Sequence, residues 1–261
     1  MSSLAIIIPA RNEEKRIGET VRDYLAYFTT LSKSKKIDSF KIIVVLNDCS
    51  DSTLEVVQKF SGKHLEILNF TKGGKGFAVI EGFKYALAKQ YTHIGFTDAD
   101  MSTRPEEFYR LFRKINSHGG VIASRYISGA VLSPPNTILR ILASRIYNFF
   151  IRSLLFIPYR DTQCGAKIFT RTALQAVVAH IGMTRWAFDI ELLYLLHRKG
   201  VKILEVPTVW SNKDYSTINF WSSGQWMTLA IIRLRLLHSP LKSLVRVYDR
   251  FTSLLRRRKR I

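Results

Sequence analysis

The sequence predicts an α/β fold with a mainly parallel sheet flanked by helices. Short apolar runs end in polar clusters, helical patterns lie between them, and this order repeats along the first hundred residues. Strands that alternate with helices in this way form parallel sheets through right-handed crossovers. Hydrophobic residues make up 47% of the 261 residues, enough for a folded core. This composition excludes a disordered chain and a small disulfide-stapled scaffold.

The first predicted strand covers residues 4–8, a continuous apolar run that stops at Pro9. A run of this kind is typical of a parallel strand that is buried on both faces. Asn12 is a candidate N-cap for a helix that carries Glu13 and Glu14 in its first turn, where acidic side chains suit the helix dipole. The sequence therefore predicts a strand, a short loop and a helix that begins near residue 12.

Three further strands follow in the first hundred residues: 41–46, 65–69 and 93–97. The segments directly after them are polar or rich in glycine: 47–51, 72–76 and 98–100. Later patterns predict a strand at 166–169 and helices at 140–156 and 220–237, with another helix beginning near 186. Because ligands of such sheets bind beyond the carboxyl ends of the strands, we expect the polar segments to meet in one crevice.

No repeat or low-complexity linker divides the chain before about residue 211, after which the sequence becomes aromatic and basic. We therefore predict one α/β domain over residues 1–212. The remaining residues, 213–261, are predicted to form an amphipathic and basic segment that associates with a membrane. The apolar stretches are interrupted by arginine or are shorter than the ~20 residues of a spanning helix, so we expect contact with a membrane rather than passage through it.

The net charge is unusual, because 40 Lys+Arg against 20 Asp+Glu leave +20. Such a surplus favours phosphates, nucleic acid or an anionic lipid surface as partners. The two cysteines, Cys49 and Cys164, have no paired CxxC spacing. They indicate neither a structural zinc site nor an oxidised framework, and they favour a reducing compartment.

The Asp-Ala-Asp segment at residues 98–100 is the sharpest local feature. Two carboxylates at a strand end can hold a hard divalent cation whose other positions are filled by phosphate oxygens and water. A solvated turn, or a helix cap before Pro105, would also explain this segment. The glycine-rich turn at 72–76 suits an anion, but it matches neither a P-loop nor GxGxxG, and a plain surface turn would also explain it.

Two further acids have alternative roles. Asp48 follows the second strand, where its carboxylate can accept a ring N–H from a base or cap the helix that begins near residue 52. Asp161 opens a tight polar segment, residues 161–165, that precedes the predicted strand at 166–169 and is also typical of a turn. Asp189 and Glu191 begin a predicted helix, where first-turn acids are common for structural reasons.

Several segments together resemble a known family. Residues 8–14, 45–50, 74–76, 98–100 and 123–125 resemble, in order, the motifs of the large inverting glycosyltransferase family with a GT-A fold. Residues 160–171 and 185–193 look like its dolichyl-phosphate β-glucosyltransferase branch. The resemblance covers roughly residues 4–237, and it implies a nucleotide sugar, UDP favoured, as donor and a polyprenyl or dolichyl phosphate as acceptor.

The resemblance also implies residue roles. The nucleoside positions are Pro9, Ala10, Asn12, Glu13 and Asp48. The diphosphate and metal positions are Lys75, Asp98, Ala99 and Asp100, where the acids would hold Mg²⁺ or Mn²⁺. The acceptor positions are Arg125, Arg140, Arg145 and Asp161. Of all these, Asp100, Arg125 and Asp161 are the predicted catalytic residues.

The chain departs from the family pattern at several positions. Asn47 replaces the first acid of the usual strand-end pair, and Cys49 replaces a common glycine. Thr217 lies near a position where relatives often carry lysine, so Lys213 is the candidate substitute.

An acceptor phosphate monoester is largely ionised near neutral pH, since its second pKa is about 6. Our hypothesis is therefore that Asp161 orients the acceptor arginines more than it removes a proton.

The resemblance thus implies inverting transfer of a hexose, UDP-glucose favoured as donor, to a polyprenyl phosphate, and we expect the protein at the cytoplasmic face of a membrane. Transfer of N-acetylglucosamine or mannose to the same lipid, or of a sugar to a polysaccharide, stays open. The helix at 140–156 is expected to lie in an anionic membrane interface as a peripheral or monotopic element, although a buried core helix would have a similar pattern. A nucleic-acid-binding protein would have the charge but no use for the clustered acids, so no nucleic acid partner is expected.

Overall fold

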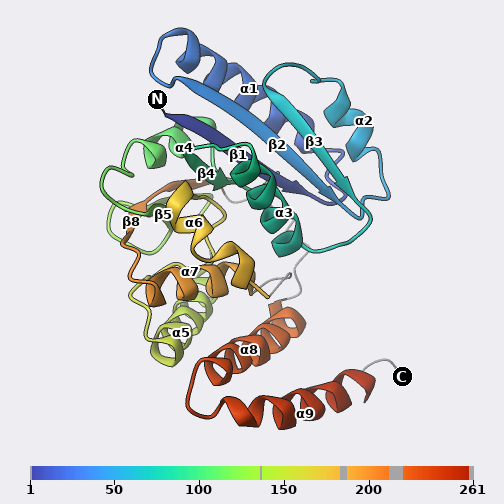
Figure 1. Ribbon diagram of the computed structural model, residues 1–261, viewed down its shortest axis with the longest axis vertical. Coiled ribbons are helices and arrows are strands. Elements are labelled where there is room, and N and C mark those ends of the chain that lie inside the picture. Colours follow the sequence, from blue (N-terminus) through green and yellow to red (C-terminus); the bar gives the residue numbers. More distant parts are fainter. Residues whose placement is uncertain (1, 136, 183–186, 212–219, 259–261) are drawn as a thin grey trace.

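The structure is a computed structural model that describes all residues except 1, 136, 183–186, 212–219 and 259–261. A seven-stranded sheet lies between two layers of helices (Figure 1). Its strands are β1 (Ser3–Ala10), β2 (Ser39–Asn47), β3 (Leu65–Phe70), β4 (His93–Phe96), β5 (Gly120–Ser124), β7 (Lys167–Thr170) and β8 (Ile203–Pro207). Two short strands, β6 (Val131–Ser133) and β9 (Val209–Ser211), pair separately.

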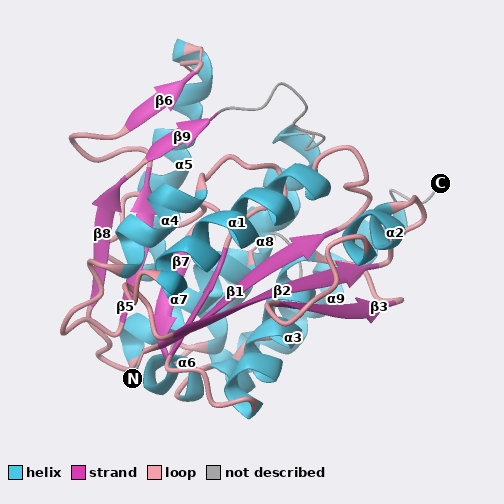
Figure 2. Ribbon diagram, turned by 90° about the horizontal axis from the view of Figure 1, so that it is seen from above, coloured by secondary structure: helices cyan, strands magenta, loops and turns pink. Residues whose placement is uncertain are grey.

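The strand order is β3-β2-β1-β4-β7-β5-β8, and every pairing in the sheet is parallel except those of β7. The arrowheads of β1, β2 and β3 point the same way (Figure 2). The prediction of a mainly parallel sheet flanked by helices is confirmed. The predicted strand at 166–169 is β7, which runs antiparallel between β4 and β5.

The helices are α1 (Ile17–Lys33), α2 (Thr53–Gln58), α3 (Lys75–Ala88), α4 (Pro105–Phe112), α5 (Ile138–Leu155), α6 (Arg171–Gln175), α7 (Phe188–Arg198), α8 (Phe220–Leu237) and α9 (Val245–Arg258). Two 3₁₀ turns cover Val178–His180 and Lys242–Leu244. The sheet separates two apolar clusters, one with α1, α2 and α4 and the other with α3, α5, α6, α7 and α8.

Strand β1 is buried on both faces of the sheet, and its sequence does not alternate between apolar and polar residues. Leu4, Ile6 and Ile8 face the cluster of α1 and α4, whereas Ala5 and Ile7 face the cluster of α3. All five side chains are fully buried. Successive side chains of a strand point to opposite faces, so a strand covered on both faces must be apolar throughout.

The helix after β1 begins at Ile17, so the prediction that Asn12 caps it is wrong. Asn12 has a φ of 55°, and its Oδ1 accepts a hydrogen bond from the Ser50 amide at 2.8 Å. Asparagine tolerates this left-handed conformation, and its amide side chain bridges two loops instead of capping a helix. Residues 11–16 therefore form a loop that is tied to the loop after β2.

The C-terminal helices lie at one end of the molecule together with α5 (Figure 1). Ile231 and Leu234 of α8 are fully buried in the same cluster as Ile151 of α5. Helix α9 contacts α8 through the ion pair between Arg233 and Asp249, which are 2.7 Å apart. The proposed division of the chain at residues 212 and 213 stays a prediction. None of the described helices combines the length and the apolar character that crossing a bilayer requires.

Candidate active site

The loops at the carboxyl ends of β1 and β2 are joined by Asn47. Its Nδ2 donates to the Ala10 carbonyl at 2.9 Å, and its Oδ1 accepts from the Gly74 amide at 3.0 Å. An ionised aspartate could not donate to Ala10, because a carboxylate is an acceptor only. This explains the departure from the family pattern at position 47: the amide holds the glycine-rich loop against the end of β1.

Asp48 lies at the rim of the same edge. Its carboxylate accepts from Arg11 Nη2 at 2.8 Å, and its own amide donates to the Phe70 carbonyl at 2.8 Å. A Cβ at Gly73 would be 3.1 Å from Asp48 Oδ2, a tight contact that would push the Asp48 side chain slightly aside. Both side chains of the Arg11–Asp48 pair are about half exposed, 58% and 49%, and a ligand can reach them. Arg11 is not among the residues that the sequence predicted for the site.

The other predicted nucleoside positions near this rim differ in burial and in hydrogen bonding. Pro9 and Ala10 are buried in β1. Glu13 forms two hydrogen bonds with Arg16, Nε to Oε2 at 2.7 Å and Nη2 to Oε1 at 2.8 Å. Burial raises the pKa of Glu13, Arg16 opposes this, and the nearby carboxylates Asp100 and Asp98 add to the rise. Glu13 therefore lies in the electrostatic field of the acidic motif.

The acidic motif itself follows β4. Asp98 Oδ1 lies 2.5 Å from Lys75 Nζ at the start of α3. Asp100 Oδ1 accepts from the Ser102 amide at 2.9 Å, and the buried Ala99 accepts from the Thr20 hydroxyl at 2.7 Å through its carbonyl. The turn is thus fixed through its backbone, and the two carboxylates remain partly exposed.

Lys75 connects the glycine-rich loop to the acidic motif. Burial alone would lower the pKa of Lys75, but the carboxylates of Asp98, Asp189 and Asp100 raise it above its ordinary value. The ammonium group therefore stays charged at neutral pH, 2.5 Å from a carboxylate. A cation held in this way is well placed to meet a diphosphate.

The acidic motif offers two carboxylates to a divalent cation, Asp98 and Asp100. Among the described residues, no three His, Cys, Asp or Glu side chains come close enough to form a metal site. Asp98 and Asp100 supply the oxygen ligands that Mg²⁺ and Mn²⁺ prefer, and Mg²⁺ is usually bound by one or two carboxylates together with substrate phosphates. The residues present fit a cation that shares its coordination with the substrate.

Arg125 and Asp161 form the second half of the site, beyond the end of β5. The Asp161 carboxylate accepts from Arg125 Nε at 2.8 Å, from Nη2 at 3.0 Å and from the Arg125 amide at 3.0 Å. Asp161 is fully buried, whereas 20% of the Arg125 side chain is exposed. Burial would raise the pKa of Asp161, but Arg125 holds it below its ordinary value. The guanidinium also lies over the ring of Trp210, 5.2 Å from its centroid.

The position of β7 explains why the two halves lie together. Because β7 is antiparallel to β4 and β5, the loop before it, residues 161–165, lies at the carboxyl ends of both strands. One end of this loop supplies Asp161 to Arg125. At its other end, a Cβ at Gly165 would overlap the Asp98 carboxylate, so a larger residue there would displace the Asp98 side chain. The loop therefore contacts Asp98 at one end and Arg125 at the other. Asp48, Lys75, Asp98 and Asp100 are called the predicted donor half, and Arg125 and Asp161 the predicted acceptor half.

The loop is held by two residues that sequence reasoning missed. Glu205 in β8 accepts from the Asp161 amide at 2.8 Å and from the Arg160 amide at 3.0 Å. Asn148 in α5 accepts from the Thr162 hydroxyl at 3.2 Å. Neither residue belongs to a recognised motif, and only their positions in space reveal the role.

The remaining predicted residues lie on α5 or outside the described residues. Arg145 is exposed on α5. Arg140 lies in the first turn of the same helix, and its side chain is outside the described set. Lys213, Thr217 and residues 185–186 fall outside the described residues.

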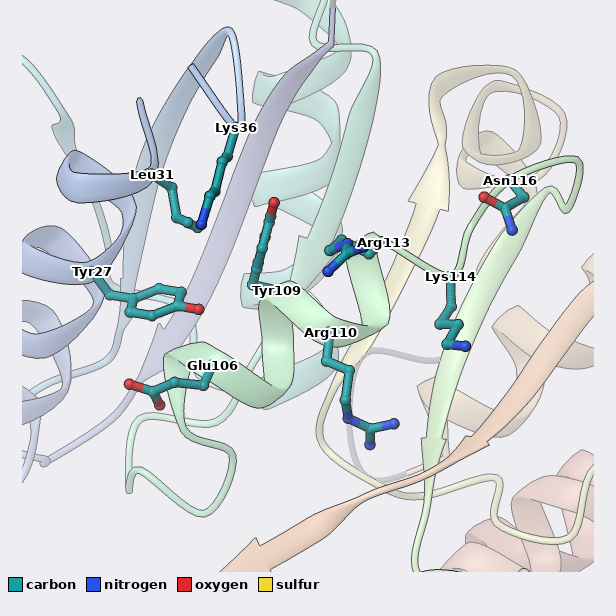
Figure 3. A pocket seen from close by; sticks show the side chains of 9 residues that line it. All are labelled: Tyr27, Leu31, Lys36, Glu106, Tyr109, Arg110, Arg113, Lys114 and Asn116. Atoms are coloured by element: carbon teal, nitrogen blue, oxygen red, sulfur yellow. The ribbon is translucent and has the colours of Figure 1, made fainter. Parts of the chain in front are cut away.

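A surface hollow of about 540 Å³ lies elsewhere, along α1 and α4 (Figure 3). Its lining residues are Tyr27, Leu31, Lys36, Glu106, Tyr109, Arg110, Arg113, Lys114 and Asn116. None of them is a predicted site residue, and they spread around both sides of α4 (Figure 3). This hollow is separate from the residues that gather at the sheet edge.

Comparisons with known proteins agree with this geometry. The family model described as "Glycosyl transferase family 2" matches residues 5–178. Dolichyl-phosphate beta-glucosyltransferase of Dictyostelium discoideum is 30% identical over 243 residues, 89% of this chain and 73% of the relative. The Homo sapiens protein of the same name is 29% identical over 248 residues, 90% of this chain and 76% of the relative.

Solved structures add support for the fold. Glucosyl-3-phosphoglycerate synthase from Mycobacterium tuberculosis, in complex with Mn²⁺, UDP and glucosyl-3-phosphoglycerate, is similar with a TM-score of 0.64 and 16% identity. The match covers 90% of this chain and 79% of that one. At this identity the likeness establishes the arrangement of strands and helices.

Proposed function

Because this chain belongs to glycosyl transferase family 2, we propose that it transfers a hexose from a nucleotide sugar, UDP-glucose in the first place, to dolichyl or another polyprenyl phosphate. One observation carries the proposal. The loop at residues 161–165 contacts Asp98 on one side and Arg125 on the other, which supports a single site in which the acids act together with an arginine that would bind phosphate. The relatives named dolichyl-phosphate beta-glucosyltransferase support this acceptor and this sugar.

In the donor half, Asp48 would accept the ring N–H of the base after Arg11 has moved aside. Lys75 would stabilise the charge that develops on the diphosphate as it leaves the sugar. Asp98 and Asp100 would hold Mg²⁺ or Mn²⁺, which supplies further positive charge at the leaving diphosphate when bound. The neighbours solved with Mn²⁺ and UDP support a divalent cation of this kind.

In the acceptor half, Arg125 presents a guanidinium that can hold a phosphate through two parallel hydrogen bonds. Asp161 fixes this guanidinium through Nε and Nη2. Asp161 is fully buried and its pKa is lowered, so it is a poor proton acceptor. An ionised phosphate needs little help from a base, and its direct attack would invert the anomeric carbon.

The surface of α5 supports membrane association. Leu139, Leu142, Ile146 and Phe149 recur at helical spacing and are exposed, Phe149 to 67%. Leu241, Leu244 and Val247 are exposed near the turn between α8 and α9, at the same end of the molecule (Figure 1). The net charge of the whole chain, +20, also favours an anionic leaflet that would hold the lipid acceptor. Peripheral association with the cytoplasmic face is part of the proposal.

The test is transfer of radiolabelled sugar from a panel of nucleotide sugars to dolichyl phosphate in vesicles that contain anionic lipid. We expect UDP-glucose to give an organic-extractable, acid-labile product, and we expect EDTA to abolish its formation. Arg125→Lys keeps the charge but loses the two-point geometry, so the acceptor KM rises. Arg113→Lys, at the exposed residue that directly follows α4, is the matched control. No transfer to dolichyl phosphate from any sugar of the panel would overturn the proposal.

A further inference from the structure

A fully buried lysine lies behind the site and has no part in the roles described so far. Lys167, the first residue of β7, has no exposed surface. Its Nζ lies 2.6 Å from Asp189 Oδ1 and donates to the Cys164 carbonyl at 2.5 Å. It also lies over the Phe96 ring, 5.2 Å from the centroid. Two of these groups neighbour the site directly, because Cys164 precedes Gly165 and Phe96 closes β4 just before the acidic motif.

Removing a charged pair from water costs free energy, and a protein with apolar residues of similar volume in its place is often equally stable or more stable. The pair between Lys167 and Asp189 is therefore not expected to contribute much to the stability of the fold. Its geometry serves another purpose. The hydrogen bond to the Cys164 carbonyl holds the loop at residues 161–165. Cys164 lies between Asp161, which pairs with Arg125, and Gly165, which contacts Asp98.

Three ion pairs lie around this loop. Arg125 pairs with Asp161, Lys167 with Asp189, and Lys75 with Asp98. The pairs also influence one another, because Lys167 contributes to the lowered pKa of Asp161, behind the larger effect of Arg125. A displacement of Lys167 would therefore disturb the acceptor half and the donor half together.

We infer that Lys167, with Asp189 as its counter-ion, is a positioning residue that holds the loop at residues 161–165 and so sets the distance between Asp98 and Arg125. The assignment rests on the proposed function for its catalytic consequence. The position of the loop can also be measured without any substrate.

Cys164 is the built-in reporter for that measurement. It is fully buried, and burial raises the pKa of its thiol to about 12, so it reacts slowly with thiol reagents. The chain contains two cysteines, so in a Cys49→Ala background Cys164 is the only thiol. Its labelling rate then reports how often the loop opens.

In this background, Lys167→Met removes the bond to the Cys164 carbonyl while keeping a long side chain. Loss of a hydrogen bond to a charged group raises the population of the open loop by about 10- to 100-fold, and labelling should accelerate by that factor. Transfer per folded molecule should fall about 100-fold, as expected when reacting groups are misplaced by about 1 Å. Lys199→Met, at the exposed end of α7, should change neither quantity.

The double variant Lys167→Met/Asp189→Asn separates positioning from stability. It removes both charges, so it should recover the thermal stability that Lys167→Met loses, yet labelling should stay fast and transfer slow. Recovery of transfer in the double variant, or unchanged labelling in folded Lys167→Met, would overturn the inference. If the parent protein transfers nothing to dolichyl phosphate while labelling behaves as expected, the proposed function fails and the positioning role stands.

Discussion

Replacement of Asp161 by asparagine tests the acceptor half most directly. The carboxylate accepts from Arg125 Nε, Nη2 and amide, and from the Gln163 amide at 3.3 Å. Asparagine keeps one acceptor oxygen and turns an NH₂ group toward these N–H donors. It also leaves Arg125, of which only 20% is exposed, without its counter-ion.

The expected loss of stability follows from these contacts. Hydrogen bonds to charged groups contribute about 1.5–3 kcal/mol each, and removing one partner of a buried ion pair costs about 3–5 kcal/mol. We expect the free energy of unfolding of Asp161→Asn, measured in urea, to fall by about 3–5 kcal/mol. Asp249→Asn breaks the half-exposed pair with Arg233 and should cost less than about 1 kcal/mol.

The dependence of stability on pH has a definite sign. The pKa of Asp161 in the folded protein is lowered, whereas the unfolded value is about 3.9. The pair therefore stabilises fully above about pH 4 and loses this contribution as the pH falls further. Urea unfolding between about pH 3 and pH 7 should show a steeper acid limb in the parent protein than in Asp161→Asn.

Activity distinguishes positioning from base catalysis. We expect kcat/KM for dolichyl phosphate to fall about 100-fold in Asp161→Asn, because Arg125 is no longer fixed. The residual activity should keep the pH profile of the parent, which follows the acceptor phosphate with its second pKa of about 6. Full activity per folded molecule would refute the role of Asp161, and loss of an acidic limb in the variant alone would show that it acts as a base.

Three further predictions follow from the site and its surroundings. Gly165→Ala should lower transfer and destabilise the fold by about 1–3 kcal/mol, because the new methyl group overlaps the Asp98 carboxylate. Gly62→Ala is the control in the same assays, because its methyl group would make only an ordinary contact, 3.9 Å from the Phe60 carbonyl oxygen. Phe149→Asp should weaken co-sedimentation with anionic vesicles about 10- to 100-fold, because an aromatic side chain that the bilayer would bury is lost. Ala26→Asp on α1 adds the same charge and should have no effect. Excess EDTA should weaken UDP binding in calorimetry, and unchanged affinity would argue against a shared cation.

Several parts of this site were determined by local sequence. The apolar runs of β1 and β2 require burial on both faces, and α3 begins within the glycine-rich segment at residues 72–76, at Lys75. The motif at residues 98–100 follows β4, as predicted. Such features depend on side-chain periodicity and turn chemistry within a few residues, which a sequence displays directly. One local rule failed, because Asn12 bonds a distant loop instead of capping α1.

Tertiary structure decided how these parts meet. A strand pattern gives neither the order nor the direction of strands, and only the antiparallel position of β7 brings Gly165 against Asp98 and Asp161 against Arg125. The same topology turns Lys167, an ordinary strand residue by its sequence, into a buried cation behind the site. Contacts between residues far apart in the chain depend on the free energy of packing the whole molecule, so local patterns do not encode them.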